Sequence, residues 1–222
     1  MWQIFIGSLV LSLIHASIPN HWIPLIAISK TEKWSVKETL FATLITGFAH
    51  TLSTVIIGII VGFIGYKLAS NYEIISKIIA PAILVTVGLI YLIIEIKNSI
   101  HHHKHEHSHF KVENNSMGRK SKWAILISLS IAMFLTPCVE LEAYYFQAGS
   151  IGWIGILIVS VVYTFTTVLL MLILVYLGIK GIKKINSHFL EHHEKAITGL
   201  ILIILGILAF ISMIIYYHLT KL

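Results

Sequence analysis

Residues 2–28 read WQIFIGSLVLSLIHASIPNHWIPLIAI, an apolar run with Pro19 inside it and a histidine on either side of that proline. A bilayer core of about 30 Å needs roughly 20 apolar residues to span it as a helix, so this run is long enough. It has no Lys or Arg ahead of it and is longer than the core of a signal peptide, which predicts a retained helix. The fold is therefore expected to begin with a membrane helix that Pro19 interrupts.

The composition of the whole chain agrees with a membrane protein. Of the 222 residues, 57% are hydrophobic and 12% are charged, the mean hydropathy is +0.87 and there is no aspartate. Such a chain cannot cover a soluble domain with a polar shell. The predicted fold class is an all-α integral membrane protein with six transmembrane helices. These are expected at about 2–28, 38–66, 74–97, 123–148, 151–178 and 195–217.

The basic residues predict the orientation of the chain. If six helices alternate, 13 of the 16 Lys and Arg residues fall on one side of the membrane and 3 on the other. By the positive-inside rule the side with 13 basic residues is cytoplasmic. Both termini are therefore expected on the opposite, outer side of the membrane. The net charge of +6 then reflects topology and contact with an anionic lipid bilayer, and it requires no nucleic-acid partner. A cytoplasmic or inner membrane location and a homo-oligomer are both compatible with this pattern.

The two halves of the chain form a weak internal repeat. At an offset of 118 residues, Pro19 aligns with Pro137 and Gly88 aligns with Gly206. Each half holds an odd number of predicted helices, so the second half would be inverted in the membrane relative to the first. A chance alignment of Leu/Ile/Val-rich helices is the alternative. The predicted organisation is two inverted three-helix repeats, each with a proline-broken first helix, around a His-rich cytoplasmic loop: residues 1–97, 123–222 and 98–122.

The two prolines also predict where backbone acceptors are left without a partner. Because proline has no N–H, Pro19 frees the carbonyl of His15 and Pro137 frees that of Met133. Freed carbonyls at membrane depth are tolerated only where protein or a wet cavity covers them. We therefore expect both helix breaks to face the interior of the protein.

Three histidines near the first break have the chemistry of metal ligands. His15 and His21 flank Pro19, and His50 lies midway along the next apolar run. On an unbroken helix His15 and His21 would lie about 240° apart, so they share a face only if the helix unwinds between them. Neutral imidazoles suit Ni, Co, Zn or Fe(II), so we predict one divalent transition-metal ion here. The alternative is that each histidine only forms a hydrogen bond with a neighbouring helix.

Four more residues near the breaks are candidate ligands of the same ion: Asn20, Cys138, Glu140 and Glu142. Glu140 and Glu142 point to opposite sides of an intact helix, and we expect Glu140 inward and Glu142 toward the outer surface. Cys138 is the one cysteine of the chain, which excludes an internal disulfide. A buried cysteine acts as a small hydrophobe more often than as a ligand, so both roles stay open for it.

Two histidine clusters lie outside the predicted helix centres. Residues 101–109 read HHHKHEHSH, which predicts an accessory metal-loading loop, with a solvated linker as the alternative. Its candidate ligands are His101, His102, His103, His105, His107 and His109. A second cluster combines His188, His192 and His193 with Glu191 and Glu194; it fits either chelation by an i,i+4 pair or a solvated face.

Two of these motifs resemble a known family. His15-Ala-Ser-Ile-Pro-Asn-His21 resembles the first-helix signature of the nickel/cobalt transporter superfamily, and Gly47-Phe-Ala-His50-Thr-Leu-Ser-Thr54 resembles its second-helix signature. Thr136-Pro137-Cys138 resembles the Pro-Cys break of related LysE-type exporters. The resemblance covers the whole chain, although only the two His motifs are specific.

The resemblance implies that His15, His21 and His50 coordinate metal and that the protein transports Ni or Co. The chain departs from the family between the first two histidines, where Ile18 and Asn20 replace the usual acids. The acids of the second half would then have to supply the negative charge.

The sequence thus leads to two functions of different classes. The first is a divalent-metal transporter with alternating access around the proline-broken helices. The second is an intramembrane metalloenzyme in which the three histidines hold Zn or Fe and Glu140 acts as a general base on bound water. A transporter releases its ion, whereas an enzyme keeps one permanently seated.

Overall fold

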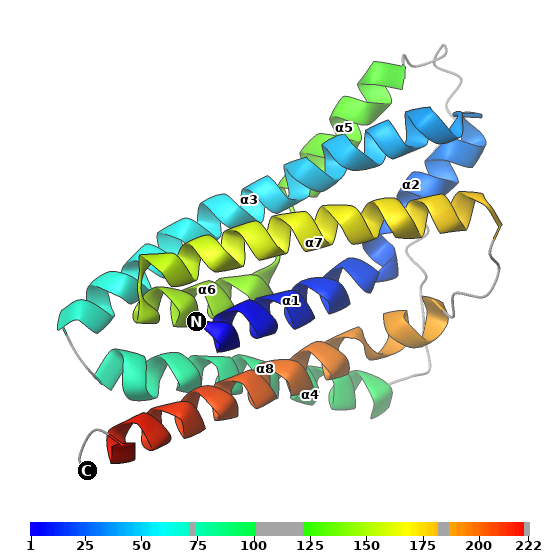
Figure 1. Ribbon diagram of the computed structural model, residues 1–222. Helices are drawn as coiled ribbons and strands as arrows, with labels where there is room; N and C mark the ends of the chain where they lie inside the picture. The colour runs from blue at the N-terminus through cyan, green and yellow to red at the C-terminus, as the bar shows by residue number, and fades with distance from the viewer. Residues whose placement is uncertain (72–73, 101–121, 182–186, 220–222) are drawn as a thin grey trace.

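A computed structural model describes residues 1–71, 74–100, 122–181 and 187–219 (Figure 1). Within these residues all regular structure is helical and no strand occurs, which confirms the all-α class. Eight α-helices and one π-helical segment follow each other along the described chain: α1 (Trp2–Ser17), α2 (Pro19–Thr31), α3 (Val36–Asn71), η1 (Ile75–Ile79), α4 (Ala80–Ile100), α5 (Lys122–Phe134), α6 (Val139–Ile151), α7 (Trp153–Ile179) and α8 (Ser187–Leu219).

Three of the described helical segments are long and apolar enough to cross a membrane: Val36–Ser70, Lys77–Lys97 and Trp153–Ile179. The α1–α2 pair provides a fourth if the bent pair is taken as one span. Shorter apolar helices occur at Lys122–Phe134 and Lys195–Ile211. Large apolar side chains are exposed along most of these helices, as a lipid environment allows. The described helices therefore indicate an integral membrane protein.

Both predicted helix breaks are present. Ile18 has extended backbone angles, with φ −64° and ψ 128°, and α1 and α2 meet there at a bend of 40°. Pro19 is the first residue of α2, where its missing N–H has no helical partner to lose. In the second half, α5 ends at Phe134 and α6 begins at Val139, so Pro137 lies between them. Pro24, in contrast, lies inside α2, which continues to Thr31.

The long helices of each half pack on the broken helix of the other half. Helix α3 packs against α5 and α6, and α7 packs against α1 and α2. Helix α3 also packs against α7, while α4 lies along α8 at one side of the molecule (Figure 1). This arrangement places the α1–α2 pair against α7 and the α5–α6 pair against α3.

The contact between α4 and α8 depends on glycine. A methyl group added at Gly88 would lie 2.5 Å from the Gly199 carbonyl oxygen, and one at Gly206 would lie 2.9 Å from the Pro81 carbonyl oxygen. Residue numbers fall along α4 as they rise along α8, so the two helices are antiparallel. Small residues allow this backbone-to-backbone packing, which is the main source of helix association in lipid.

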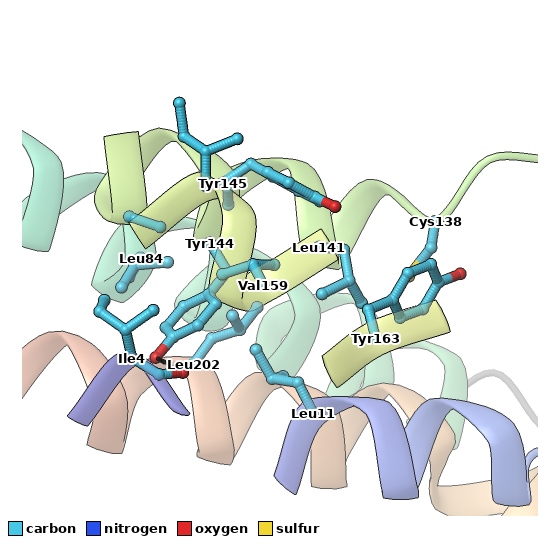
Figure 2. Packing of buried hydrophobic residues seen from close by; sticks show 13 residues of the cluster. Ile4, Leu11, Leu84, Cys138, Leu141, Tyr144, Tyr145, Val159, Tyr163 and Leu202 are labelled. Atoms are coloured by element: carbon cyan, nitrogen blue, oxygen red, sulfur yellow. Dashed lines mark hydrogen bonds between the residues drawn. The ribbon is translucent and has the colours of Figure 1, made fainter. Parts of the chain in front are cut away.

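The main apolar core lies where α1, α4, α6, α7 and α8 meet (Figure 2). Each of these helices contributes a side chain that is at most 3% exposed, among them Leu11, Leu84, Leu141, Val159 and Leu202. Cys138 belongs to the same cluster, beside Tyr163. The core therefore ends where the second helix break begins.

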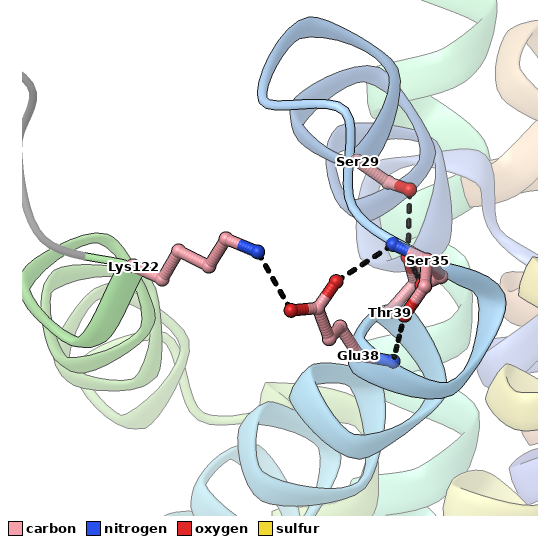
Figure 3. A network of polar contacts seen from close by, with 5 residues as sticks. All are labelled: Ser29, Ser35, Glu38, Thr39 and Lys122. Atoms are coloured by element: carbon pink, nitrogen blue, oxygen red, sulfur yellow. Dashed lines mark hydrogen bonds and ion pairs between the residues drawn. The ribbon is translucent and has the colours of Figure 1, made fainter.

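A polar network joins the starts of α3 and α5 (Figure 3). The Ser35 backbone N–H donates to Glu38 Oε2 at 2.8 Å and the Glu38 N–H donates to Ser35 Oγ at 3.3 Å, which is a capping box. Lys122 Nζ pairs with Glu38 Oε1 at 2.6 Å, and the Thr39 hydroxyl bonds with that of Ser29 at 2.6 Å. These bonds hold α2, α3 and α5 together at one end of the molecule.

We expect Gly199→Ala to destabilise the α4–α8 contact. Its new methyl group would lie 2.7 Å from the Gly88 carbonyl oxygen, and overpacking of this kind costs about 1–3 kcal/mol. Thermal unfolding in detergent should show a lower midpoint for this variant. Leu200→Ala, at a neighbouring side chain that is 53% exposed, should leave the midpoint near that of the wild type. Equal midpoints for the two variants would contradict this account of the interface.

Candidate metal centre

The break at Pro19 brings His15 and His21 together. His15 lies in the last turn of α1 and His21 lies in the first turn of α2, and their ring centroids are 4.4 Å apart. His15 is buried and His21 is partly buried. The Ile18 N–H donates to the His15 carbonyl at 3.1 Å, so this carbonyl is not left unpaired by the break. The prediction that the helix must unwind for these histidines to meet is confirmed.

His50 completes the group from α3. Its Nε2 lies 3.0 Å from His15 Nε2, and its ring centroid lies 4.8 Å from that of His21. Two nitrogens bound to one tetrahedral ion at about 2.0–2.1 Å lie about 3.3 Å apart, close to the observed separation. One ligand atom from each of the three rings lies within 4.8 Å of the others. The three imidazoles could therefore hold a single metal ion after small movements.

The second break orients His50. Met133 O lies 3.2 Å from His50 Nδ1 and also accepts from the Thr136 N–H at 3.4 Å and the Thr136 hydroxyl at 3.1 Å. A carbonyl oxygen only accepts, so Nδ1 carries the proton and Nε2 keeps its lone pair. That lone pair faces His15, as a metal ligand requires. The contact with Met133 O thus favours the His50 tautomer that can bind metal through Nε2.

A second group of possible ligands adjoins the first. Cys138 Sγ lies 3.3 Å from His15 Nδ1 and 2.9 Å from Glu140 Oε2. Ligand atoms of His15, Cys138 and Glu140 all lie within 4.8 Å of one another. The two groups share His15, whose Nε2 faces His50 and whose Nδ1 faces Cys138. The sequence predicted a cavity role for Glu140, and the structure places it in this group.

Hydroxyl groups on α3 and α7 position the start of α6. The Cys138 N–H donates to Thr54 Oγ1 at 3.1 Å, and the Tyr163 hydroxyl lies 3.4 Å from the same oxygen. Thr54 is one turn beyond His50, so this bond ties the second ligand group to the helix that carries the first. Neither contact follows from the sequence, because only tertiary packing brings Thr54, Cys138 and Tyr163 together.

The bond from His50 to Met133 was also missed at the sequence level. Its signal was Pro137, which follows Met133 by four residues and marks that carbonyl as free. Nothing in the sequence indicated which donor would reach it, since 83 residues separate His50 from Met133.

Two predicted ligands lie differently from expectation. Both carboxylate oxygens of Glu142 are buried, with no hydrogen-bond partner among the described residues, rather than facing the outer surface. The structure does not include Glu142 in either ligand group. Asn20 is exposed in the first turn of α2, unlike the buried rings of His15 and His50. Roles for these two residues in metal binding remain predictions.

The two accessory histidine clusters have side chains outside the part of the chain that the structure describes. The tract at 101–109 lies outside the described residues. The backbone of 187–194 belongs to α8, while the side chains of His188, His192 and His193 are outside the described part.

Comparisons of this chain with protein-family models, with curated proteins and with solved structures gave no match. Membership of the nickel/cobalt transporter superfamily therefore stays a prediction from the two His motifs. The functional argument rests on the geometry of the ligand groups.

We expect Pro137→Ala to weaken metal binding, because the new N–H would add a further donor to the Met133 carbonyl that His50 already shares with Thr136. Loss of an orienting partner of a histidine ligand typically lowers metal affinity about 10–100-fold. Calorimetric titration of the detergent-purified protein with Co²⁺ or Ni²⁺ measures the change. Pro24→Ala, inside α2, should retain the wild-type affinity. Unchanged affinity in Pro137→Ala would mean that the Met133 carbonyl does not orient His50.

Proposed function

We propose that this chain is a membrane transporter of divalent transition-metal ions, of the Ni, Co, Zn and Fe class. The substrate site is formed by His15, His21 and His50. The observation that carries the proposal is the convergence of these three imidazoles between two helix breaks, inside apolar helices, with the lone pair of His50 aimed at the others.

The cost of the arrangement supports a ligand role. On insertion scales, a charged side chain at the centre of a membrane helix is unfavourable by about 2.5–3.5 kcal/mol. Here two buried histidines and a buried thiol with its acidic neighbour are gathered within hydrogen-bond distances. Packing alone would be served better by apolar side chains. A metal ion provides these groups with a common partner that lipid cannot supply.

An inverted repeat gives the mechanism of alternating access. In this arrangement α1–α2 corresponds to α5–α6, α3 to α7, and α4 to α8. Six spans result when each broken pair is one span and η1 continues into α4. The packing supports the correspondence, because α3 contacts both pieces of one broken helix and α7 contacts both pieces of the other. Rocking of one repeat against the other would open the site to each side in turn.

The glycine contacts between α4 and α8 support the same repeat. At the sequence offset of 118 residues, Gly88 corresponds to Gly206 and Pro81 corresponds to Gly199. The contact of Gly88 with Gly199 is therefore equivalent, under the repeat, to the contact of Gly206 with Pro81. Both contacts are present. A two-fold axis in the membrane plane relates equivalent helices in an antiparallel manner, as α4 and α8 run.

The sidedness of the protein follows from where the helices end. The α2–α3 turn, the end of α4, the starts of α5 and α8 and the end of α7 lie at one end in Figure 1. These ends adjoin the loops that carry most of the Lys and Arg residues, which supports a cytoplasmic location for this end by the positive-inside rule. The His-rich tract at 101–109 then lies on the cytoplasmic side, where it binds ions before export or buffers them after uptake.

The geometry favours a transporter over an enzyme. As a general base, Glu140 would need to reach a metal-bound water, but its Oε2 bonds with Cys138 Sγ at 2.9 Å. A site between two helix breaks also suits an ion that leaves. Metal analysis after chelator washing separates the two functions, because a stoichiometric ion that survives washing would favour the enzyme.

Replacing His15, His21 or His50 with alanine should lower metal affinity and transport by about tenfold or more, since each removes one ligand from a three-histidine site. His188→Ala, in α8, should retain both. Affinity is measured on the purified protein and transport by metal uptake into proteoliposomes. Full transport by the His50→Ala variant would overturn the proposed site.

The proposed topology is tested with reporter fusions. Alkaline phosphatase joined after Leu222 should be active, because the C-terminus is placed outside the cytoplasm. The same reporter inserted within residues 110–120 should be inactive. The opposite pattern would reverse the orientation, and equal activity at both sites would contradict an odd number of spans between them.

A further inference from the structure

We infer that the metal site contains two adjacent ion positions that share His15 and are occupied one at a time. The first, here called the histidine position, uses His15 Nε2 with His21 and His50. The second, called the thiolate position, uses His15 Nδ1 with Cys138 and Glu140. This inference rests on the proposed function and assigns the path that the ion takes through the site.

The geometry of His15 carries the inference. Its two ring nitrogens each face a different set of donors, with His50 Nε2 at 3.0 Å from Nε2 and Cys138 Sγ at 3.3 Å from Nδ1. Cys138 Sγ is in turn 2.9 Å from Glu140 Oε2. Each set of three ligand atoms is compact enough for one ion. His15 and Cys138 are buried, at 9% and 3% exposure, so water does not replace these partners from outside.

A neutral imidazole makes the two positions mutually exclusive. It has one lone pair and one N–H, so a metal on one nitrogen places the proton on the other. Ions on both nitrogens would also lie only about 6 Å apart, given metal-to-nitrogen distances of about 2.0–2.1 Å. Two divalent charges at that separation in an apolar interior repel strongly. One ion therefore moves between the two nitrogens of a single ring.

In the ion-free protein, the observed hydrogen bonds leave the thiolate position ready to bind an ion. Met133 O holds the proton of His50 on Nδ1, so the His50 Nε2 lone pair must accept from His15 Nε2–H. The lone pair of His15 then lies on Nδ1 and faces the sulfur of Cys138, whose thiol proton is donated to Glu140 Oε2 at 2.9 Å. An ion that binds there displaces the thiol proton of Cys138 onto a water of its own hydration shell, which leaves with the proton. The ion then meets thiolate, carboxylate and imidazole. Movement to the histidine position requires the other tautomer of His15.

The two positions differ in charge and softness. The thiolate position provides two negative charges from Cys138 and Glu140, whereas the histidine position provides neutral nitrogens. A thiolate favours Zn and Co over Mg, Ca or Mn. The thiolate position thus selects the ion, and the neutral histidine position binds it weakly enough for release. It also supplies the negative charge that Ile18 and Asn20 do not provide between the two histidines.

Cobalt spectroscopy tests the inference on the full-length protein in detergent. Co²⁺ bound to thiolate gives a ligand-to-metal charge-transfer absorption in the near ultraviolet, and Co²⁺ bound to nitrogen gives only the weaker visible bands. We expect the wild type to bind one Co²⁺ per chain with the charge-transfer band. Cys138→Ser should lose this band and keep the visible bands, while His50→Ala should keep the charge-transfer band. Thermal unfolding of each variant without metal checks that it is folded.

Each outcome has a distinct meaning. Visible cobalt bands without charge transfer in the wild type would overturn the thiolate position and leave the proposed transporter standing. Two Co²⁺ per chain would overturn the exclusive use of His15. Loss of the charge-transfer band in folded His50→Ala would mean that there is one composite position rather than two. Absence of any cobalt binding would overturn the proposed function itself.

Discussion

The candidate metal centre depends on one hydrogen bond, from His50 Nδ1 to the carbonyl of Met133. The Met133 carbonyl lies in the last turn of α5 and also accepts from the Thr136 N–H at 3.4 Å and the Thr136 hydroxyl at 3.1 Å. Pro137 breaks the helix before α6 and removes the i+4 helical donor of this carbonyl, so His50 on α3 shares the acceptor with Thr136. A polar group at membrane depth must find a protein partner, which makes the pairing of these two helices obligatory.

The apolar packing holds this bond in place. Gly62 on α3 and Gly149 on α6 allow backbone contact, since a methyl group at Gly149 would lie within van der Waals overlap of the Gly62 carbonyl. The Cys138 N–H bond to Thr54 aligns the start of α6 with the turn of α3 that follows His50. Small residues thus set the distance between the helices, and the polar bonds set their register.

The side chains of His50, His15, Cys138 and Glu140 form a continuous chain of contacts that begins at Met133 O. A metal ion would replace some of these contacts with coordination bonds. These contacts stabilise the site when no ion is bound, as a site that binds and releases its ion requires.

The sequence by itself determined the helical class, the apolar segments, both proline breaks and the three histidines, because hydropathy, the missing proline N–H and ligand chemistry are local properties. It did not determine the residues at which each helix ends and the next begins within the runs 2–28 and 123–148. Only the tertiary structure decided that His50 meets Met133, that Cys138 meets His15, and that the carboxylate of Glu142 is buried. Those contacts join residues 83 or more positions apart, or depend on how a whole helix is rotated, and neither is encoded in any short stretch of chain.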